Sequence, residues 1–250
     1  MRSARLSPPR PAVVLVAHGS RDPRAAASTE ALARAVRQAR PEWLVRATYL
    51  DHAGPRPLDV LAALGRRRAV LVPLLLTAAY HGKVDLPAVV SAAAGLPVDV
   101  SLADVLGPLP LRTAPRLLLD ALVRRLPAPE TFDAVVLASA GTRDAAARGT
   151  VEHAAAALGA RLGVPAAVSY SSGAGPRAGE AVRALRDGGA RRVAVAGYFL
   201  APGLLYDLAV SSGREAGAVA VAEPLGDAPE LVGLISARVA AAGVRALAAA

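Results

Sequence analysis

Residues 12–23 read AVVLVAHGSRDP, and this stretch decides the fold. Its six apolar residues predict a buried strand, and the polar segment 18–22 predicts the turn that leads into a helix. Residues 134–144 read AVVLASAGTRD and repeat the same order of apolar run, glycine turn and aspartate. Asp22 and Asp144 each precede an alanine-rich segment and are expected to cap or orient the helix that follows.

Strand-like and helix-like segments alternate along the whole chain. In the first half, strands are predicted at 12–17, 45–50, 69–75 and 98–102, and helices at 24–40, 58–66, 84–94 and 113–125. In the second half, strands are predicted at 134–138, 166–170, 193–198 and 219–222, and helices at 145–162, 177–187, 204–216 and 229–248. This alternation predicts parallel sheets with helices on both faces.

The two halves also match by residue type at equivalent places. Tyr49 followed by residues 53–56 corresponds to Tyr170 followed by residues 174–177. The sequence therefore predicts an α/β protein of two similar lobes, each a small parallel sheet flanked by helices, with a cleft between them. The expected divisions are a tail at 1–11, a first lobe at 12–126, a proline-rich linker at 126–130 and a degenerate second lobe at 131–250.

The composition excludes several classes of protein. The chain has no cysteine, which excludes disulfides, thiolate metal sites and a cysteine nucleophile. Its apolar runs are too short to span a bilayer and no secretory signal is recognised, so we expect a cytoplasmic protein without membrane contact. Net charge is +9, and 28 of the 29 basic residues are arginine, which suits a polyanionic ligand but also follows from a GC-rich genome. No nucleic-acid-reading motif is present, so no nucleic-acid partner is predicted.

Two of the four histidines follow predicted strands at equivalent strand-to-helix junctions. His18 follows the first strand and His81 the third, so both are expected at the carboxyl edge of one parallel sheet. Their counterparts in the second half are Ala140 and Leu205. We therefore predict that the first half carries the site and that the second is a structural lid or wall. Neutral imidazoles can hold a divalent metal or accept a proton, and two of them form an incomplete site suited to a metal that is passed on.

The remaining polar candidates are weaker. Asp51 follows the second strand and is expected either to be a third ligand or to take a proton. His52 is expected to be a solvated loop residue, and His153 a structural residue of an alanine-rich helix. No phosphate-binding glycine motif follows the first strand, and Ser20 lies outside any nucleophile elbow.

Four segments resemble those of the sirohydrochlorin chelatases, the small class II chelatases, and two of them are histidine motifs. Residues 16–23 (VAHGSRDP) are similar to the opening motif of the family, and residues 72–87 to its second histidine motif. Residues 49–51 (YLD) resemble its Phe-Leu-Glu segment, and residues 106–108 its late Leu-Gly turn. The resemblance covers nearly the whole chain, as the two-lobed form of the family. It implies insertion of Fe²⁺ or Co²⁺ into sirohydrochlorin, toward siroheme or cobalamin, with the metal as substrate and no prosthetic group.

The resemblance also implies roles for individual residues. It assigns His18 and His81 as metal-holding and proton-accepting residues, and Asp51 stands where the family often has a longer glutamate. Because sirohydrochlorin carries many carboxylates, arginines near the predicted cleft are candidate substrate contacts. These are Arg21, Arg24, Arg56, Arg143 and Arg177.

Two other functional classes remain open. One is a tetrapyrrole or metal carrier that performs no insertion, and the other is a periplasmic-type pair of binding lobes, which the absence of a signal disfavours. A duplicated chain can replace a dimer of single units, so a monomer is expected.

Overall fold

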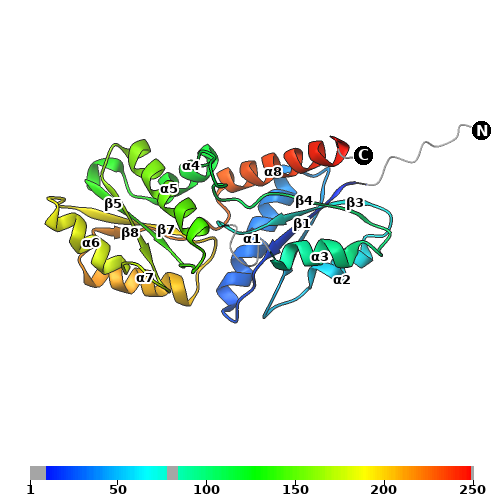
Figure 1. Ribbon diagram of the computed structural model, residues 1–250, viewed down its shortest axis with the longest axis horizontal. Helices are drawn as coiled ribbons and strands as arrows, with labels where there is room; N and C mark the ends of the chain where they lie inside the picture. Colours follow the sequence, from blue (N-terminus) through cyan, green and yellow to red (C-terminus); the bar gives the residue numbers. More distant parts are fainter. Residues whose placement is uncertain (1–9, 78–83, 249–250) are drawn as a thin grey trace, which may run out of the picture.

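The structure, a computed structural model, describes residues 10–77 and 84–248. It contains two βα lobes that lie side by side along the long axis of the molecule (Figure 1). Most of the predicted tail at 1–11 lies outside the described residues, and so does His81.

The sheet of the first half is parallel, as predicted, with the strand order β2-β1-β3-β4. Its strands are β1 (Ala12–Ala17), β2 (Leu44–Tyr49), β3 (Arg68–Pro73) and β4 (Asp99–Leu102). Every residue of the central strand β1 is buried, because the strand has neighbours on both sides and helices over both faces. This burial explains why the run contains no polar residue before His18.

The sheet of the second half repeats this arrangement, with the order β6-β5-β7-β8. Its strands are β5 (Ala134–Ser139), β6 (Ala166–Tyr170), β7 (Val193–Tyr198) and the short β8 (Ala220–Val221). All its pairings are parallel as well. The two-lobed α/β prediction is therefore confirmed.

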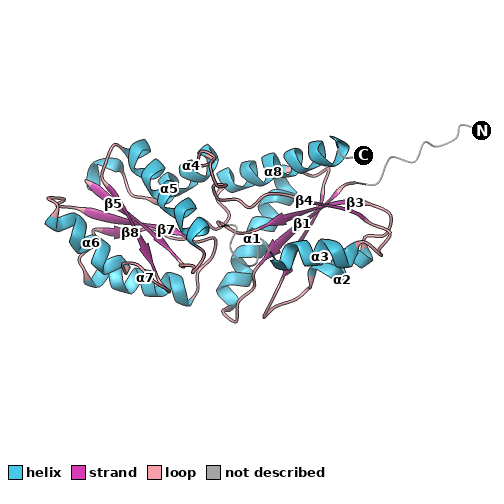
Figure 2. Ribbon diagram, viewed as in Figure 1, coloured by secondary structure: helices cyan, strands magenta, loops and turns pink. Residues whose placement is uncertain are grey.

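Helices cover both faces of each sheet (Figure 2). They are α1 (Pro23–Ala39), α2 (Pro57–Ala63), α3 (Leu86–Ala93), α4 (Arg116–Arg125), α5 (Ala145–Leu162), α6 (Ala178–Asp187), α7 (Leu204–Glu215) and α8 (Pro229–Ala248). A short 3-10 helix, Pro129–Thr131, lies at the end of the predicted linker. Asp22 and Asp144 cap α1 and α5 as predicted: their carboxylates accept hydrogen bonds from the backbone N–H groups of Arg24 (2.9 Å) and Ala147 (3.1 Å).

The last helix of each half packs against the other half. Helix α8 lies against β3 and β4 of the first sheet, and α4 lies against α5 and β7 of the second. The two helices also contact each other. The division of the chain into lobes at 12–126 and 131–250 stays a prediction. In space, each half contributes its final helix to the packing of the other half.

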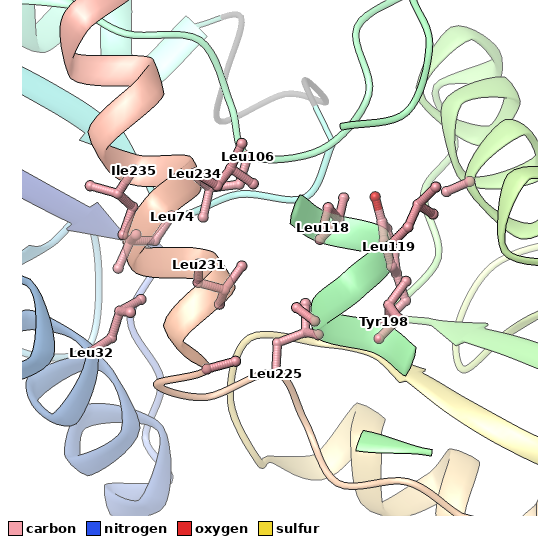
Figure 3. Close-up of a cluster of buried hydrophobic side chains, with 14 of the residues drawn as sticks. Leu32, Leu74, Leu106, Leu118, Leu119, Tyr198, Leu225, Leu231, Leu234 and Ile235 are labelled. Atoms are coloured by element: carbon pink, nitrogen blue, oxygen red, sulfur yellow. The ribbon is translucent and has the colours of Figure 1, made fainter. Parts of the chain in front are cut away.

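This exchange produces one apolar core that runs through both lobes. Leu74 and Leu106 of the first half share a buried cluster with Tyr198 and Leu225 of the second, and Leu118 of α4 lies between them (Figure 3). Two smaller clusters lie beneath the outer helices, one in each lobe. The shared core fixes the relative position of the lobes and therefore the shape of the space between them. None of the described helices combines the length and apolar character needed to cross a membrane.

Candidate active site

The loops that follow β1 and β2 are joined by their backbones. Asp51 donates its N–H to the carbonyl oxygen of His18 (2.8 Å), one residue beyond a similar bond between Leu50 and Ala17 (3.0 Å). Gly19 adopts a left-handed conformation with φ of 95°, and a Cβ there would overlap the carbonyl oxygen of Asp51. Glycine is required at this close approach. The structure thus brings His18 and Asp51 together at one edge of the sheet.

Asp51 is a half-exposed carboxylate in a positive environment. The hydrogen bond from the backbone N–H of His52 (2.8 Å) lowers the pKa of Asp51 the most, and the nearby His52, Arg56 and His18 lower it further. A carboxylate with a lowered pKa stays ionised well below neutral pH. Both roles predicted for Asp51, a third ligand and a proton acceptor, stay predictions.

His52 lies closer to the predicted site than its sequence context indicates. Its ring stands edge-on to the ring of His18, with centroids 6.4 Å apart and planes at 82°. Its Nε2 atom is 3.4 Å from Oδ2 of Asp51. His52 is an exposed loop residue, as predicted, and it is in addition a neighbour of His18. The available signal was its place directly after Asp51, at a position where the second half has glycine.

A cleft between the lobes opens beside His18. An inner pocket of about 260 Å³ extends from His18 past Tyr49 and Leu74 to Phe199 and Leu200 of the second half. A more open outer pocket of about 580 Å³ shares His18 and Phe199 with the inner one. The outer pocket lies within the ~300–1,000 Å³ typical of ligand sites. The sequence pointed to neither Phe199 nor Leu200, because apolar residues after a strand resemble core.

The second half contributes a wall without imidazoles to this cleft. Ala140, the counterpart of His18, and Leu205, the counterpart of His81, both line the outer pocket. His52 and Arg21 line the same pocket from the first half. A ligand in the outer pocket would therefore meet mostly polar groups of the first half and mostly apolar groups of the second.

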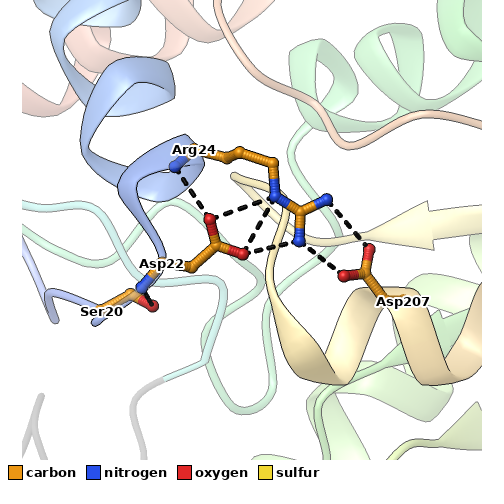
Figure 4. A network of polar contacts seen from close by, with 4 residues as sticks. All are labelled: Ser20, Asp22, Arg24 and Asp207. Atoms are coloured by element: carbon orange, nitrogen blue, oxygen red, sulfur yellow. Dashed lines mark hydrogen bonds and ion pairs between the residues drawn. The ribbon is translucent and has the colours of Figure 1, made fainter.

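Arg24 links the two lobes next to the cleft. Its guanidinium donates to Asp22 at the start of α1 and to Asp207 on α7, with Nη2 at 2.6 Å from an oxygen of each (Figure 4). These hydrogen bonds, first those to Asp22 and then those to Asp207, raise the pKa of Arg24, so the group stays charged. A substrate carboxylate that binds Arg24 must compete with Asp207.

The other predicted arginines occupy different places. Arg21 lines the outer pocket, and Arg56 donates to the carbonyl oxygen of Leu50 beside Asp51. Arg143 is exposed in the loop after β5, and Arg177 donates to the carbonyl oxygen of Tyr170 (2.7 Å) before α6. Neither Arg143 nor Arg177 lines the inner or outer pocket. Contact of any of the five arginines with substrate stays a prediction.

His81 lies outside the described residues, so its separation from His18 stays a prediction. The chain that leads toward it is attached to the second half, because the Tyr198 hydroxyl donates to the carbonyl oxygen of Leu76 (3.2 Å). Within residues 10–77 and 84–248, no group of three or more His, Cys, Asp or Glu side chains is arranged to hold a metal ion.

A larger hollow lies away from His18, at the amino-terminal ends of the first-half strands. It measures about 1,060 Å³ and is lined by three consecutive arginines, 66–68, and by Asp99 and Val239. No imidazole occurs among the described residues that line it. Its larger volume favours this hollow as a ligand site, but His18, the described residue of the predicted histidine pair, lines the cleft.

Comparison with known proteins gives the family. The CbiX family model matches residues 12–125 and again residues 134–242, the two halves of the duplication. Because these matches cover most of the chain, the chain belongs to the CbiX family. No curated protein sequence matches it.

Several solved structures share the fold. SirB from Bacillus subtilis with Fe³⁺ has 21% identity and a TM-score of 0.72, covering 92% of this chain and 94% of that one. The sirohydrochlorin chelatase SirB from Bacillus subtilis subspecies spizizenii in complex with cobalt has 20% identity, the same TM-score, and coverage of 92% and 93%. A CbiX described as the terminal enzyme for siroheme biosynthesis in denitrifying bacteria has 21% identity and a TM-score of 0.66, covering 93% of this chain and 99% of that one.

Proposed function

We propose that this chain inserts a divalent metal, Fe²⁺ or Co²⁺, into sirohydrochlorin, as a step toward siroheme or cobalamin. The observation that carries the proposal is the interlobe cleft with His18 on one wall, in a member of the CbiX family. The names of two similar solved structures, SirB with Fe³⁺ and the sirohydrochlorin chelatase SirB in complex with cobalt, support the same activity.

The residues of the first half suit metal transfer. An imidazole such as His18 can hold a divalent ion while the other coordination positions stay open for the tetrapyrrole nitrogens. His81 remains the predicted second ligand. Holding ion and ring together converts a two-body encounter into an oriented one, which can lower the barrier by up to about 7–11 kcal/mol. Two ring N–H protons must leave during insertion, and an imidazole that has released the ion to the ring regains the lone pair with which it can accept one of them; Asp51 is the other predicted acceptor.

Charge around the cleft suits a polycarboxylate substrate. Arg21 lines the outer pocket together with His18, and Arg24 binds Asp207 of the opposite half. Arginine binds carboxylates through two parallel hydrogen bonds, which lysine cannot reproduce. Exchange of Asp207 for a substrate carboxylate on Arg24 would couple substrate binding to the interlobe bridge.

One site per chain is proposed, in the first half. The wall formed by Ala140 and Leu205 offers no imidazole at the duplicated positions. We expect Ala140→His to add no second metal equivalent, because Leu205 leaves the second half without its other imidazole. A monomer, a cytoplasmic location and the absence of nucleic-acid partners remain predictions from the sequence.

The test mixes purified protein, sirohydrochlorin and Fe²⁺ or Co²⁺ and follows the absorption change of the tetrapyrrole. We expect insertion much faster than in the protein-free mixture. His18→Ala should remove most of this rate, whereas His153→Ala, which alters an exposed imidazole on α5, should not. A rate equal to the protein-free one, with ligand bound stoichiometrically, would identify a carrier and reject the enzyme.

A further inference from the structure

His52 and His18 occupy the same part of the cleft. Both line the outer pocket, and their ring centroids are 6.4 Å apart. The side chain of His52 is 33% exposed, so a hydrated ion in the pocket can reach it. Neither the motifs that resemble the chelatases nor the duplication argument assigned a role to this residue.

The second half provides an internal comparison for this position. Asp51 donates to the carbonyl oxygen of His18, and in the same way Ser172 donates to that of Ala140 (3.0 Å). Gly19 and Gly141 have φ angles of 95° and 96°, so the two loops follow the same path. The residue after Asp51 is therefore equivalent to the residue after Ser172, which is Gly173.

Both equivalent residues are left-handed, with φ of 59° at His52 and 73° at Gly173. Glycine adopts this conformation without strain, whereas a side chain with a Cβ does so at a cost, even for histidine, which tolerates it better than most. Histidine, which is less favourable than glycine in this left-handed conformation, occurs in the half that also has His18. The half with glycine has alanine in place of His18. Fold requirements alone explain the glycine and do not explain the histidine.

Asp51 holds His52 in place. One carboxylate oxygen accepts the backbone N–H of His52 at 2.8 Å, and the other lies 3.4 Å from Nε2 of its ring. The backbone bond needs no side chain at position 52, so it does not by itself account for an imidazole there. A carboxylate beside an imidazole is the usual arrangement that orients a metal-binding histidine.

We propose that His52 is a metal-binding residue that, together with His18, captures the divalent ion in the outer pocket before insertion. This inference rests on the proposed function and deepens it, because it names a ligand for the incoming metal that the motifs do not contain. In the capture step, one ring nitrogen of each histidine replaces one water molecule of the hydrated ion. No proton or electron is transferred.

The distances allow this capture with a small movement. A metal–nitrogen bond of about 2.0–2.1 Å places the centroids of two imidazoles roughly 5 Å apart around a tetrahedral ion. The observed separation of 6.4 Å is therefore about 1 Å too long. Rotation of two side chains that border open space in the cleft can supply this change without movement of the backbone.

The experiment measures binding of Co²⁺ alone, by visible absorption and calorimetric titration of the full chain without tetrapyrrole. The main variant is His52→Gly, which installs the residue that the second half uses at this conformation and keeps the backbone N–H donor to Asp51. The matched control is His153→Gln, and His18→Ala is the positive reference. Thermal unfolding of every variant shows whether the fold is retained.

We expect His52→Gly to unfold at or slightly above the wild-type temperature and to bind Co²⁺ at least about tenfold more weakly, the lower limit for losing even an outer-shell partner. The intensity of the cobalt absorption bands should also fall in His52→Gly. His153→Gln should match wild type in both Co²⁺ affinity and spectrum. Unchanged Co²⁺ affinity and spectrum in His52→Gly, or no Co²⁺ binding by the wild-type chain, would overturn the inference.

A parallel insertion assay separates this inference from the proposed function. If the wild-type chain binds Co²⁺ through His52 but does not accelerate insertion, the proposed function fails and the metal site stands. If insertion is fast and His52→Gly binds Co²⁺ and inserts it like wild type, the proposed function stands and the role of His52 is rejected.

Discussion

The hydroxyl of Tyr198 makes one of several polar contacts between the halves, and Tyr198→Phe removes that contact alone. Tyr198 ends β7, is 2% exposed, and donates to the carbonyl oxygen of Leu76 in the first half at 3.2 Å. Burial raises the pKa of Tyr198 well above its usual range, so the hydroxyl stays protonated and remains a donor. Phenylalanine keeps the ring and its packing in the shared core.

The loss of stability in Tyr198→Phe depends on the carbonyl oxygen of Leu76, which the substitution leaves without its donor. A neutral hydrogen bond contributes about 0.5–1.5 kcal/mol net, and a buried acceptor left without a donor costs about 1–3 kcal/mol. Leu76 is only partly buried, so water can partly replace the hydroxyl. We therefore expect Tyr198→Phe to lower the free energy of unfolding by about 1–2 kcal/mol, measured by urea denaturation at pH 7.

Tyr206→Phe is the matched control. Its hydroxyl donates to the carbonyl oxygen of Ala222 (3.1 Å), and both groups belong to the second half. The two variants should lose similar stability, but only Tyr198→Phe should speed amide hydrogen exchange in the first half, at the segment after β3. If Tyr198→Phe changes neither stability nor first-half exchange, or if Tyr206→Phe changes first-half exchange equally, the reasoning about an interlobe attachment is wrong.

Three further predictions concern contacts between the halves. Leu231→Ala truncates a fully buried side chain of α8 in the shared core and should cost about 2–5 kcal/mol in urea denaturation; a loss below about 1 kcal/mol would show that α8 is not packed there. Asp207→Asn removes a competitor for Arg24, so the KM for sirohydrochlorin should fall severalfold; a rise would assign Asp207 a positive role in binding. Hydrogen bonding from Arg124 lowers the pKa of Glu230 below its ordinary 4.5, so this pair stabilises the fold above that pH and the contribution is lost as pH falls further. Glu230→Gln should flatten the acid limb of stability against pH, and an unchanged limb would contradict this assignment.

The sequence by itself determined the order and type of the elements. Residues 12–17, 134–139 and 193–198 form buried central strands because their runs are apolar except at the last position of the latter two, where Ser139 and Tyr198 stand. Asp22 and Asp144 could be recognised as caps because capping depends on neighbours within three residues. The duplication and the histidine motif around His18 could be recognised from the sequence for the same reason, because both depend on residues that are close together along the chain.

Only the tertiary structure decided which distant segments meet. The packing of α8 against β3 and β4, the bridge from Arg24 to Asp207 and the placement of Phe199 beside His18 in the cleft join residues more than 100 positions apart. Periodicity and spacing contain no information about such pairs, because packing of the shared core selects them. The neighbour relation between His18 and His52 depends in addition on a left-handed backbone angle. Local preference predicts glycine at a left-handed position. That His52 adopts this conformation was therefore visible only in the folded chain.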